Sequence, residues 1–251
     1  RCLWRHIVRS NMTQWDPEAL TVLSNEEVIY KEENARLFHL KYFRTDNPDL
    51  FITIATQRPE TIMADVAIAV HPQDERYQSF IGKSVFVPLI NREIPIIADA
   101  YVDIEFGTGA LKITPAHDQN DYEIGKKHKL PVIDILTPNG KLNEKATILV
   151  GQDRFEARKN IKKLLEEAGT LEKIEDYRTS IGHSERTDAV VEPRLSLQWW
   201  VKMAPLACSR SARSMPGPRG RAPTSRQTSA SLNATFGSSV AIMPCSSGKA
   251  Q

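Results

Sequence analysis

Three short polar segments contain the side chains of this 251-residue sequence that are best suited to do chemistry. They are TQRPET at Thr56–Thr61, FGTGALK at Phe106–Lys112 and TPAHDQND at Thr114–Asp121. Each segment lies where an apolar run begins or ends. Loops and strand ends hold polar groups on a rigid frame, and binding and catalytic residues usually lie there. We therefore treat the three segments as one candidate site.

The third segment combines an imidazole with two carboxylates. Asp118 is well placed to cap the helix expected after it, with Asp121 as the acidic residue three positions later. Asp121 is then free to face a pocket, where a carboxylate suits a cationic group such as an ammonium. His117, Asp118 and Asp121 could instead ligate a metal. No fourth ligand lies nearby in the sequence, so a zinc site is a weak hypothesis and no metal ligand is predicted.

The second segment joins a glycine turn to a lysine. A strand rather than a helix is expected after Gly107–Gly109, which removes the usual context of a nucleotide-binding loop. The loop is either a tight turn or a direct backbone contact to a ligand. Lys112 either offers positive charge to an ester carbonyl or sugar oxygen, or is a solvated strand lysine.

The first segment supplies hydroxyls and a guanidinium. Thr56 and Thr61 suit a strand and a turn as well as they suit a ligand, and Pro59 favours the turn. The three segments contain no nucleophile paired with a base, because they have no Gly-x-Ser-x-Gly elbow and no Cys near a His. This set predicts binding and water-mediated hydrolysis rather than covalent catalysis.

A mainly β framework is predicted to position these segments. Short apolar runs between turn residues indicate strands. Strands are expected at Leu50–Thr56, Val66–Val70, Ser84–Leu89, Glu93–Ala98, Ala110–Thr114 and Val132–Leu136. Few helices and no regular alternation of strand and helix argue against a doubly wound parallel sheet. A barrel-like β core with helical insertions fits better.

Three helices are expected. One runs over Gln119–His128. A second covers Arg154–Ala168, with Asp153 as its N-cap and Gly169 at its end. A third, less strongly indicated, covers Asp74–Phe80 and is ended by Gly82.

The composition, with 41% apolar residues, is that of an ordinary soluble protein. No apolar run approaches the roughly eighteen residues that would cross a bilayer. Arg1–Ser10 lacks the apolar stretch of a signal peptide, so we expect a cytoplasmic protein without membrane contact. Cys2, Cys208 and Cys245 are scattered and predict neither a disulfide framework nor a cysteine zinc site.

The net charge of +2 depends on the C-terminal segment. Ala204–Gln251 holds five Arg, one Lys and no acidic side chain, and removing these 6 from the 33 basic residues leaves 27 against 31 acidic ones. A domain with a balance of −4 is not held to RNA by bulk attraction and needs a local basic lining or a partner domain. The same segment is rich in Ser, Ala, Arg and Pro, and we expect it to be disordered.

The polar segments and their surroundings together resemble the editing domain of valyl-tRNA synthetases. The resemblance rests on TQRPET, DIEFGTGALKITPAHDQND, KLPVIDILTPNGKLNE and VGQDRFEARK, in that order. It extends through Gly182–Arg186 and Val191–Met203, and back to Trp15–Leu20, so it covers about three quarters of the chain. The isoleucyl and leucyl enzymes have related domains, but the motifs FGTG, beginning at Phe106, and HDQND, beginning at His117, favour the valyl member.

This resemblance implies a fold, a reaction and a partner. The fold would be mainly β with α insertions, the closed β-barrel-like editing domain of class I aminoacyl-tRNA synthetases. The reaction would be hydrolysis of threonyl-tRNA(Val), because a valine pocket cannot strongly reject threonine and a second site removes the mistake, a standard example of editing. The partner would be the 3′ end of tRNA(Val) carrying threonine. We expect a monomer that needs no cofactor for editing.

The resemblance also implies roles for ten residues. Asp121, Lys112 and Thr56 are expected to be catalytic, with Asp121 holding the substrate α-ammonium. The attacking water would be positioned by the polar groups and a ribose hydroxyl. The substrate-binding residues are expected to be Arg58, Thr61, Asp103, Phe106, Thr114, His117 and Asp118.

Two of these residues carry the expected specificity. Asp118 would contact the threonine hydroxyl, and a site built around that hydroxyl leaves polar groups unpaired when valine enters. Phe106 would shape the pocket and stack on the terminal adenine.

The sequence departs from the family at several places. Gln57 stands where a second Thr is usual, and Ala64 where Gly is usual. Gln57 should point away from the ligand if Thr56 points toward it, since successive strand residues face opposite sides. The HIGH-like and KMSKS-like signatures of the charging domain are absent, so the chain is not expected to bind ATP or make valyl-tRNA.

Four segments are expected along the chain. An N-terminal flanking segment spans residues 1–42. Its residues 1–12 are suspected of out-of-frame translation, as the tail is. The editing domain spans residues 43–190, and a return segment toward the catalytic domain spans residues 191–203. Residues 204–251 form a disordered tail whose composition suggests out-of-frame translation. Without the other tRNA-binding domains, weak affinity for RNA is expected.

Three hypotheses about function stay open on the sequence alone. The first is the deacylase described above. The second is a folded but inactive remnant that only binds tRNA or aminoacyl-adenosine. The third is a free-standing metal-dependent hydrolase, which a loss of activity with a chelator would indicate.

Overall fold

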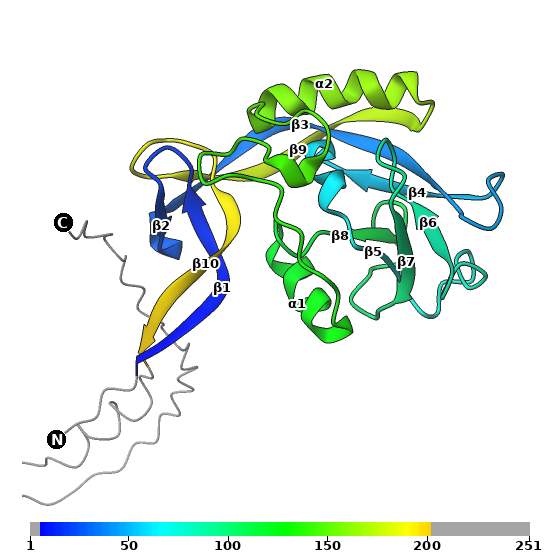
Figure 1. The fold of residues 1–251 in the computed structure, drawn as a ribbon, viewed down its shortest axis with the longest axis horizontal. Coiled ribbons are helices and arrows are strands. Elements are labelled where there is room, and N and C mark those ends of the chain that lie inside the picture. The colour runs from blue at the N-terminus through cyan, green and yellow to red at the C-terminus, as the bar shows by residue number, and fades with distance from the viewer. Residues whose placement is uncertain (1–5, 202–251) are drawn as a thin grey trace, which may run out of the picture. The chain divides into compact units, whose positions relative to one another are not determined.

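The computed structural model describes residues 6–201 (Figure 1). The chain divides into two compact units, one of which is residues 12–196. The apolar core and the polar pocket both lie within this unit. The predictions for residues 1–5 and for the tail at 204–251 lie outside the described residues. The proposed domain boundaries at residues 42 and 190 stay predictions.

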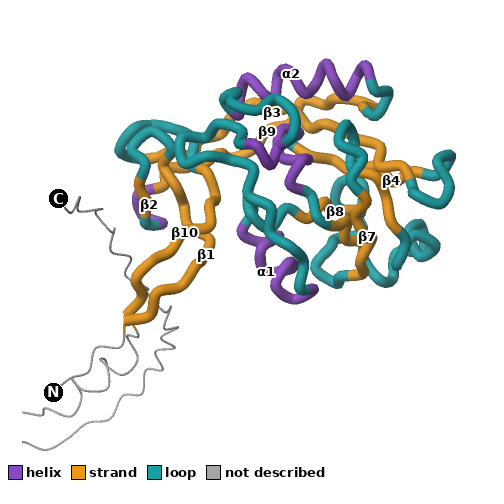
Figure 2. Tube along the Cα trace, in the orientation of Figure 1, coloured by secondary structure: helices purple, strands orange, loops and turns teal. Residues whose placement is uncertain are grey.

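Strands are more extensive than helices in the described trace, as Figure 2 shows. The elements in order are β1 (His6–Asp16), β2 (Thr21–Leu23), η1 (Asn25–Glu27), β3 (Val28–Phe43), β4 (Phe51–Thr56), η2 (Pro59–Ala64), β5 (Ala67–Val70), β6 (Ser84–Phe86), β7 (Glu93–Ala98), β8 (Ala110–Ile113), α1 (Gln119–His128), η3 (Glu144–Ala146), α2 (Arg154–Glu167), β9 (Leu171–Ser184) and β10 (Glu192–Val201). The elements labelled η are 3₁₀ helices. The mainly β fold with helical insertions is confirmed. No described helix is long and apolar enough to span a bilayer.

The strands form three sheets within the described part of the chain. Their orders are β10-β1-β2, β4-β3-β9 and β6-β7-β5-β8. An isolated bridge between Arg44 and Val85 connects the end of β3 to β6. β4 also packs against β8, but no ladder joins these two strands.

The prediction of a closed barrel is therefore not confirmed, since none of the described sheets closes on itself. The gap between β4 and β8 is occupied by side chains of both strands, including Ala55, Thr56, Leu111 and Lys112, which line a pocket. We call this gap the seam.

The apolar core forms because short strands alternate or are apolar throughout. In β4, Ile52 and Ile54 point inward, and the alternation ends at the buried Thr56. All of β5 is buried, because it lies between β7 and β8 in its sheet and carries only Ala, Ile and Val. Such continuous apolar runs are typical of strands covered on both faces. The core thus fixes the ends of the strands that border the seam.

The longest strands were not predicted. β3 pairs with β9 from Val28↔Ser184 to Leu40↔Leu171, and its last residues also pair with β4. The first half of β3 is mostly exposed and rich in charged side chains, so it has no apolar face that would reveal a strand. β1, β2 and β10 were likewise not predicted.

Two predicted helices are confirmed. α1 has the expected bounds, and the Asp118 carboxylate accepts hydrogen bonds from the backbone N–H groups of Asn120 and Asp121. α2 ends one residue before the predicted end, and Asp153 caps it by accepting from the N–H of Phe155. Gly169 follows with φ of +66°, a left-handed conformation that glycine adopts readily.

The predicted helix at Asp74–Phe80 is wrong, because this segment forms successive turns. The Asp74 carboxylate accepts from the backbone N–H and the guanidinium of Arg76, a local arrangement that competes with helix formation. The predicted strand at Val132–Leu136 is also wrong. Its Ile135 N–H donates to the His117 ring instead of to a ladder. The strand predicted at Ser84–Leu89 ends at Phe86, and residues 88–90 form a turn in which Leu89 has φ of +69°.

The Asp74–Arg76 turn supports the glycine loop that borders the pocket. The Arg76 guanidinium donates to the carbonyl of Ile104 at 2.9 Å, while paired with Asp74 at 2.6 Å. A Cβ on Gly109 would lie 2.3 Å from Arg76 Nη2 and 3.1 Å from the Ile104 carbonyl oxygen. A Cβ on Gly107 would meet no atom within 4 Å.

This difference predicts unequal effects for two alanine substitutions. Gly107 and Gly109 both have positive φ, of +61° and +73°, so either substitution strains the backbone by about 1–2 kcal/mol. Gly109→Ala also displaces the Arg76 guanidinium, and we expect it to lower the free energy of unfolding by about 1–2 kcal/mol more than Gly107→Ala does. Urea unfolding of both variants measures the difference. Equal destabilisation would contradict the role of Arg76.

Candidate active site

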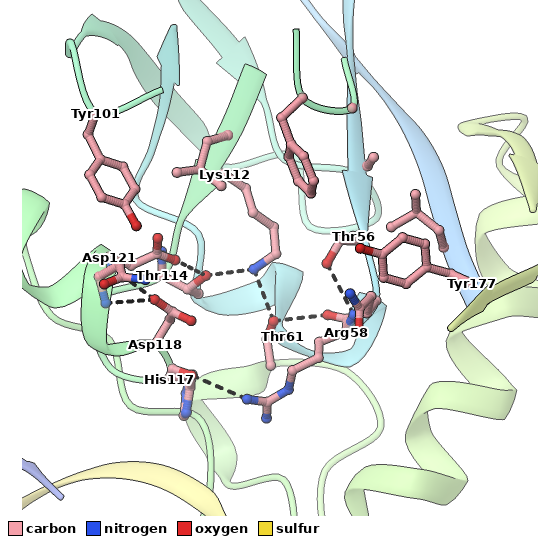
Figure 3. Close-up of a pocket in the computed structure, with 17 residues that line it drawn as sticks. Thr56, Arg58, Thr61, Tyr101, Lys112, Thr114, His117, Asp118, Asp121 and Tyr177 are labelled. Carbon is pink, nitrogen blue, oxygen red and sulfur yellow. Dashed lines mark hydrogen bonds between the residues drawn. The ribbon is translucent and has the colours of Figure 1, made fainter. Parts of the chain in front are cut away.

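A pocket of about 460 Å³ opens at the seam (Figure 3). One wall consists of the end of β4 and of η2, and we call it the β4 wall. The other wall runs from β8 to the start of α1, and we call it the β8 wall. Nine of the predicted site residues line this pocket, namely Thr56, Arg58, Thr61, Phe106, Lys112, Thr114, His117, Asp118 and Asp121.

The tenth residue, Asp103, lines an adjoining cavity of about 300 Å³ instead. Gln57 was expected to face away but also lines the main pocket. β4 ends at Thr56, so the alternation of a strand does not continue to Gln57. Several lining residues were not predicted, among them the aromatic residues Tyr101 and Tyr177, which Figure 3 places near Asp121 and Thr56. Leu37 is another, and it lies with Tyr177 on the unpredicted strand pair β3 and β9.

Asp121 is the carboxylate of the β8 wall. It is 5% exposed, and it accepts hydrogen bonds from the backbone N–H of Thr114 at 2.8 Å and from its hydroxyl at 3.2 Å. The carboxylate of Asp121 therefore bonds to Thr114, and only the backbone N–H of Asp121 bonds to the N-cap residue Asp118. Burial raises the pKa of Asp121 to about 6, although nearby Lys112 acts in the opposite direction. A buried carboxylate of this kind gains from the arrival of a cation.

Lys112 connects the two walls. Its Nζ donates to Thr114 Oγ1 at 2.6 Å and to Thr61 Oγ1 at 3.1 Å, as Figure 3 shows. It also pairs with Asp65 at 3.3 Å, and only 11% of its side chain is exposed. The interpretation of Lys112 as a solvated strand lysine is therefore wrong.

Asp65 lies beneath the pocket and is fully buried. It accepts from the Tyr42 hydroxyl at 2.7 Å as well as from Lys112. Burial raises the pKa of Asp65 despite the opposing charge of Lys112. Burial, with Asp65 next to it, also raises the pKa of Tyr42 well above its usual value. The pocket floor is therefore a buried Tyr–Asp–Lys chain.

The β4 wall is shaped by hydrogen bonds to the main chain of Arg58. The Thr56 hydroxyl accepts from the Arg58 N–H at 3.1 Å, and the Thr61 hydroxyl donates to the Arg58 carbonyl at 2.9 Å. Both threonines therefore serve the turn and also line the pocket. The two interpretations that the sequence left open are compatible.

The guanidinium of Arg58 is occupied by protein groups. It donates to Glu192 at 2.5 Å, to Glu60 at 3.4 Å and to the carbonyl of His117 at 3.2 Å. Burial opposes the charge of Arg58, but Glu192 and Glu60 together outweigh this effect and raise its pKa. Arg58 thus braces the β4 wall against the β8 wall.

The ring of His117 is buried and directed toward the backbone of the following loop. Its Nε2 accepts from the N–H of Ile135 at 3.2 Å, so the neutral ring carries its proton on Nδ1. Burial lowers the pKa of His117 well below its usual value, and the charge of Arg58 adds to this effect. Among the described residues, no group of three or more His, Cys, Asp or Glu side chains is arranged to hold a metal ion.

Two buried carboxylates that organise the site were missed as site residues. Asp65 lies in the apolar segment TIMADVAIAV, and Glu192 follows two valines. A buried carboxylate needs a cation or several donors, because desolvation of an unpaired charge is costly. A lone acid within an apolar run was the available signal, but it does not reveal which cation will be its partner.

Comparison with known proteins gives the class of protein to which this site belongs. Residues 73–161 match the family described as leucyl-tRNA synthetase, editing domain. This segment includes the glycine loop and the whole β8 wall. The chain therefore carries an aminoacyl-tRNA synthetase editing domain.

Within that class, the chain is similar to valine–tRNA ligases. The chain is 54% identical over 198 residues to valine–tRNA ligase of Porphyromonas gingivalis, covering 79% of this chain and 23% of that protein. It is 56% identical over 196 residues to the Bacteroides fragilis protein, covering 78% and 22%. It is 58% identical over 193 residues to the Halalkalibacterium halodurans protein, covering 77% and 22%. The domain belongs to the valyl-tRNA synthetase family, and the chain spans less than a quarter of these relatives' length.

A solved leucyl-tRNA synthetase of Agrobacterium radiobacter, in a ternary complex with tRNA and LeuAMS, has a weaker likeness. It is 17% identical, covers 70% of this chain and 30% of its own, and has a TM-score of 0.46. A likeness at this level does not extend the assignment.

The Lys112–Asp65 pair predicts a non-additive effect on stability. Lys112→Met leaves the fully buried Asp65 without its cation, and breaking a buried pair costs about 3–5 kcal/mol. Asp65→Asn retains an acceptor for the Tyr42 hydroxyl, so the double variant Lys112→Met/Asp65→Asn should be more stable than Lys112→Met alone. Urea unfolding of the two single variants and the double variant measures this coupling. Strictly additive effects would show that the pair does not stabilise the pocket floor.

Proposed function

We propose that this domain hydrolyses the ester of mischarged aminoacyl-tRNA and that its substrate is threonyl-tRNA(Val). The observation that carries the proposal is the buried carboxylate of Asp121, which faces a pocket already lined by hydroxyls and by Lys112. The α-ammonium of an aminoacyl ester supplies the cation that this carboxylate lacks. The family assignment supports the reaction class.

Specificity for threonine is assigned to Asp118. Both capping hydrogen bonds of Asp118 go to its Oδ1, which leaves Oδ2 for a substrate hydroxyl at the exposed edge of the pocket. Valine has the same shape without the hydroxyl and would leave this carboxylate oxygen without a partner. Correctly charged valyl-tRNA is then a poor substrate.

The hydrolysis proceeds by direct attack of water on the ester carbonyl. The three N–H donors of Lys112 already have acceptors in Thr61, Asp65 and Thr114. An ester or sugar oxygen must therefore share or replace the hydroxyl of Thr61 or Thr114, and the displaced hydroxyl becomes free to orient the water. The bond from water to the carbonyl carbon forms, the bond to the ribose oxygen breaks, and the proton that the water loses is taken up by the ribose oxygen, so that the amino acid and the ribose hydroxyl are released. No metal or other cofactor enters this proposal.

The 3′ end of tRNA(Val) is the proposed partner. Phe106 and Tyr101 are 71% and 55% exposed at the pocket, and Phe106 offers a face on which the terminal adenine can stack. The adjoining cavity, lined by Asp103 and Phe106, offers a continuation of the path along which the RNA strand would run. We propose that the protein is a cytoplasmic monomer and that its RNA contacts are local ones around this rim.

Substitution of Asp121 gives the most direct test. Asp121→Asn keeps an acceptor for Thr114 but loses the charge that holds the ammonium. We expect kcat/KM for threonyl-tRNA(Val) hydrolysis to fall by about 10- to 100-fold. The measurement is release of radiolabelled threonine from threonyl-tRNA(Val) by the full chain.

The matched control is Glu123→Gln, which removes an exposed carboxylate from the same helix, where it pairs only with Lys126. This variant should hydrolyse the ester as the wild type does. Valyl-tRNA(Val) serves as the specificity control. A folded wild-type chain that binds threonyl-tRNA(Val) without cleaving it would be the inactive remnant, and the proposal would be wrong.

The raised pKa of Asp121 predicts a dependence of hydrolysis on pH. The carboxylate must be ionised to hold the ammonium, and its pKa is about 6 in the folded protein. Below pH 6, kcat/KM should therefore fall about tenfold for each pH unit, while above it the carboxylate is ionised and the rate levels off. The profile in Asp121→Asn should lack this acidic limb. A wild-type profile that is flat from pH 5 to 7 would contradict the role of Asp121, and spontaneous ester hydrolysis is subtracted at each pH.

A further inference from the structure

A buried network of ions connects the start of β10 to the pocket. Glu192, the first residue of β10, accepts from Arg58 at 2.5 Å and from Arg154 at 3.4 Å. Glu60 accepts from the guanidinium of Arg158 at 2.7 Å and from Arg58 at 3.4 Å. The two carboxylates are nearly completely buried, so their charges are strongly coupled to those of the arginines. Of these three arginines, Arg58 is the one that donates hydrogen bonds to both carboxylates.

Arg58 lies where the two walls of the pocket meet. Its main chain orients Thr56 and Thr61 in the β4 wall. Its guanidinium donates to the carbonyl of His117, the residue before the N-cap of α1. The distance between the walls therefore depends on where this guanidinium is held.

Glu192 is better placed than Glu60 to hold it. Glu60 lies in the short helix η2, two residues after its N-cap residue Arg58, so it moves with Arg58. Glu192 comes from a different strand, 134 residues later, and its bond to Arg58 is the shorter of the two. Glu192 is itself fixed by Arg154 at the start of α2, which also donates to the carbonyl of Val190 at 2.7 Å.

Glu192 does not touch the space a ligand would fill. It is absent from the residues that line the pocket, whereas Arg58 and His117 are present. Its Oε1 lies 3.9 Å from His117 Nδ1, on the buried side of that ring. Any effect of Glu192 on a ligand must therefore pass through Arg58 and the His117 loop.

We propose that Glu192 is a positioning residue for the editing reaction: it holds Arg58 against the His117 carbonyl and so sets the spacing between the β4 wall and the β8 wall. This inference rests on the proposed function only for its kinetic consequence. The structural consequence, local protection of the two walls, is independent of any activity.

Hydrogen exchange of the full chain tests the structural consequence. Glu192→Gln keeps the size of the side chain and removes its charge. Exchange should become at least about tenfold faster at the N–H groups of Thr61 and His117, which are bonded within the two walls. Exchange in β5 should be unchanged. Glu172→Gln, which removes an exposed carboxylate from β9, is the matched control and should leave both regions as in the wild type.

Kinetics of threonyl-tRNA(Val) hydrolysis test the functional consequence. Glu192→Gln should lower kcat by about 10- to 100-fold with little change in KM, since small displacements of reacting groups are costly to the rate. If Glu192 acts through Arg58, the double variant Arg58→Gln/Glu192→Gln should be no slower than Arg58→Gln alone. Glu192→Asp, which keeps the charge, should recover part of the rate and of the exchange protection.

The outcomes separate the two proposals. Faster exchange confined to the walls supports positioning by Glu192, and it does so even if the wild-type chain shows no hydrolysis and the proposed function fails. Uniformly faster exchange that includes β5 shows a general effect on stability and overturns the inference. If Glu192→Gln does not fold, Glu192→Asp is judged by the same exchange criteria. Unchanged exchange in the walls, or additive losses of kcat in the double variant, also overturns it.

Discussion

The pocket depends on the neutralisation of a buried carboxylate at the seam, where no ladder joins β4 to β8. Lys112 reaches across the seam, and its ammonium meets Asp65 beneath and the hydroxyls of Thr61 and Thr114 on either side. Without that cation, a fully buried carboxylate would lie under an open cavity, which is energetically costly. Because Lys112 bonds to residues of both walls, the same contact that neutralises Asp65 also fixes the width of the site.

The open seam explains why the site lies where it does. A ladder between β4 and β8 would have closed the sheets and used these backbone groups for pairing. Instead, short buried strands such as β5 hold the strand ends rigidly, and polar side chains occupy the gap. The brace through Arg58 and Glu192 lies deeper than the Lys112 contact and draws β10 into the same arrangement. The two walls are therefore connected at two places, through Lys112 at the pocket floor and through Arg58 behind the His117 loop.

The sequence predicted the site better than the framework around it. Local signals were strong in α1, where Asp118 caps the helix, and in β7, whose bounds were predicted correctly. They were weak in β3 and β9, because long ribbons with charged, exposed faces carry no apolar period. The position of the three polar segments at strand ends suggested one site, and the resemblance supported this grouping, since spacing alone left each residue an ordinary alternative. The partners of Asp65 and Glu192 are distant in sequence, and no local pattern identifies them.

The cations of the pocket are paired with carboxylates, whereas the carboxylate of Asp121 has no cation paired with it among the described residues. Arg58 is neutralised by Glu192 and Glu60, and Lys112 by Asp65, so these cations have little charge to offer a ligand. Asp121 is the exception on the β8 wall, since burial raises its pKa from 3.8 to about 6, a change equivalent to about 3 kcal/mol. A ligand that brings an ammonium to Asp121 recovers part of this energy, whereas a free carboxylate or a neutral ester does not. In the proposed reaction, the aminoacyl ester would complete the charge balance of the site while it places its carbonyl near Lys112.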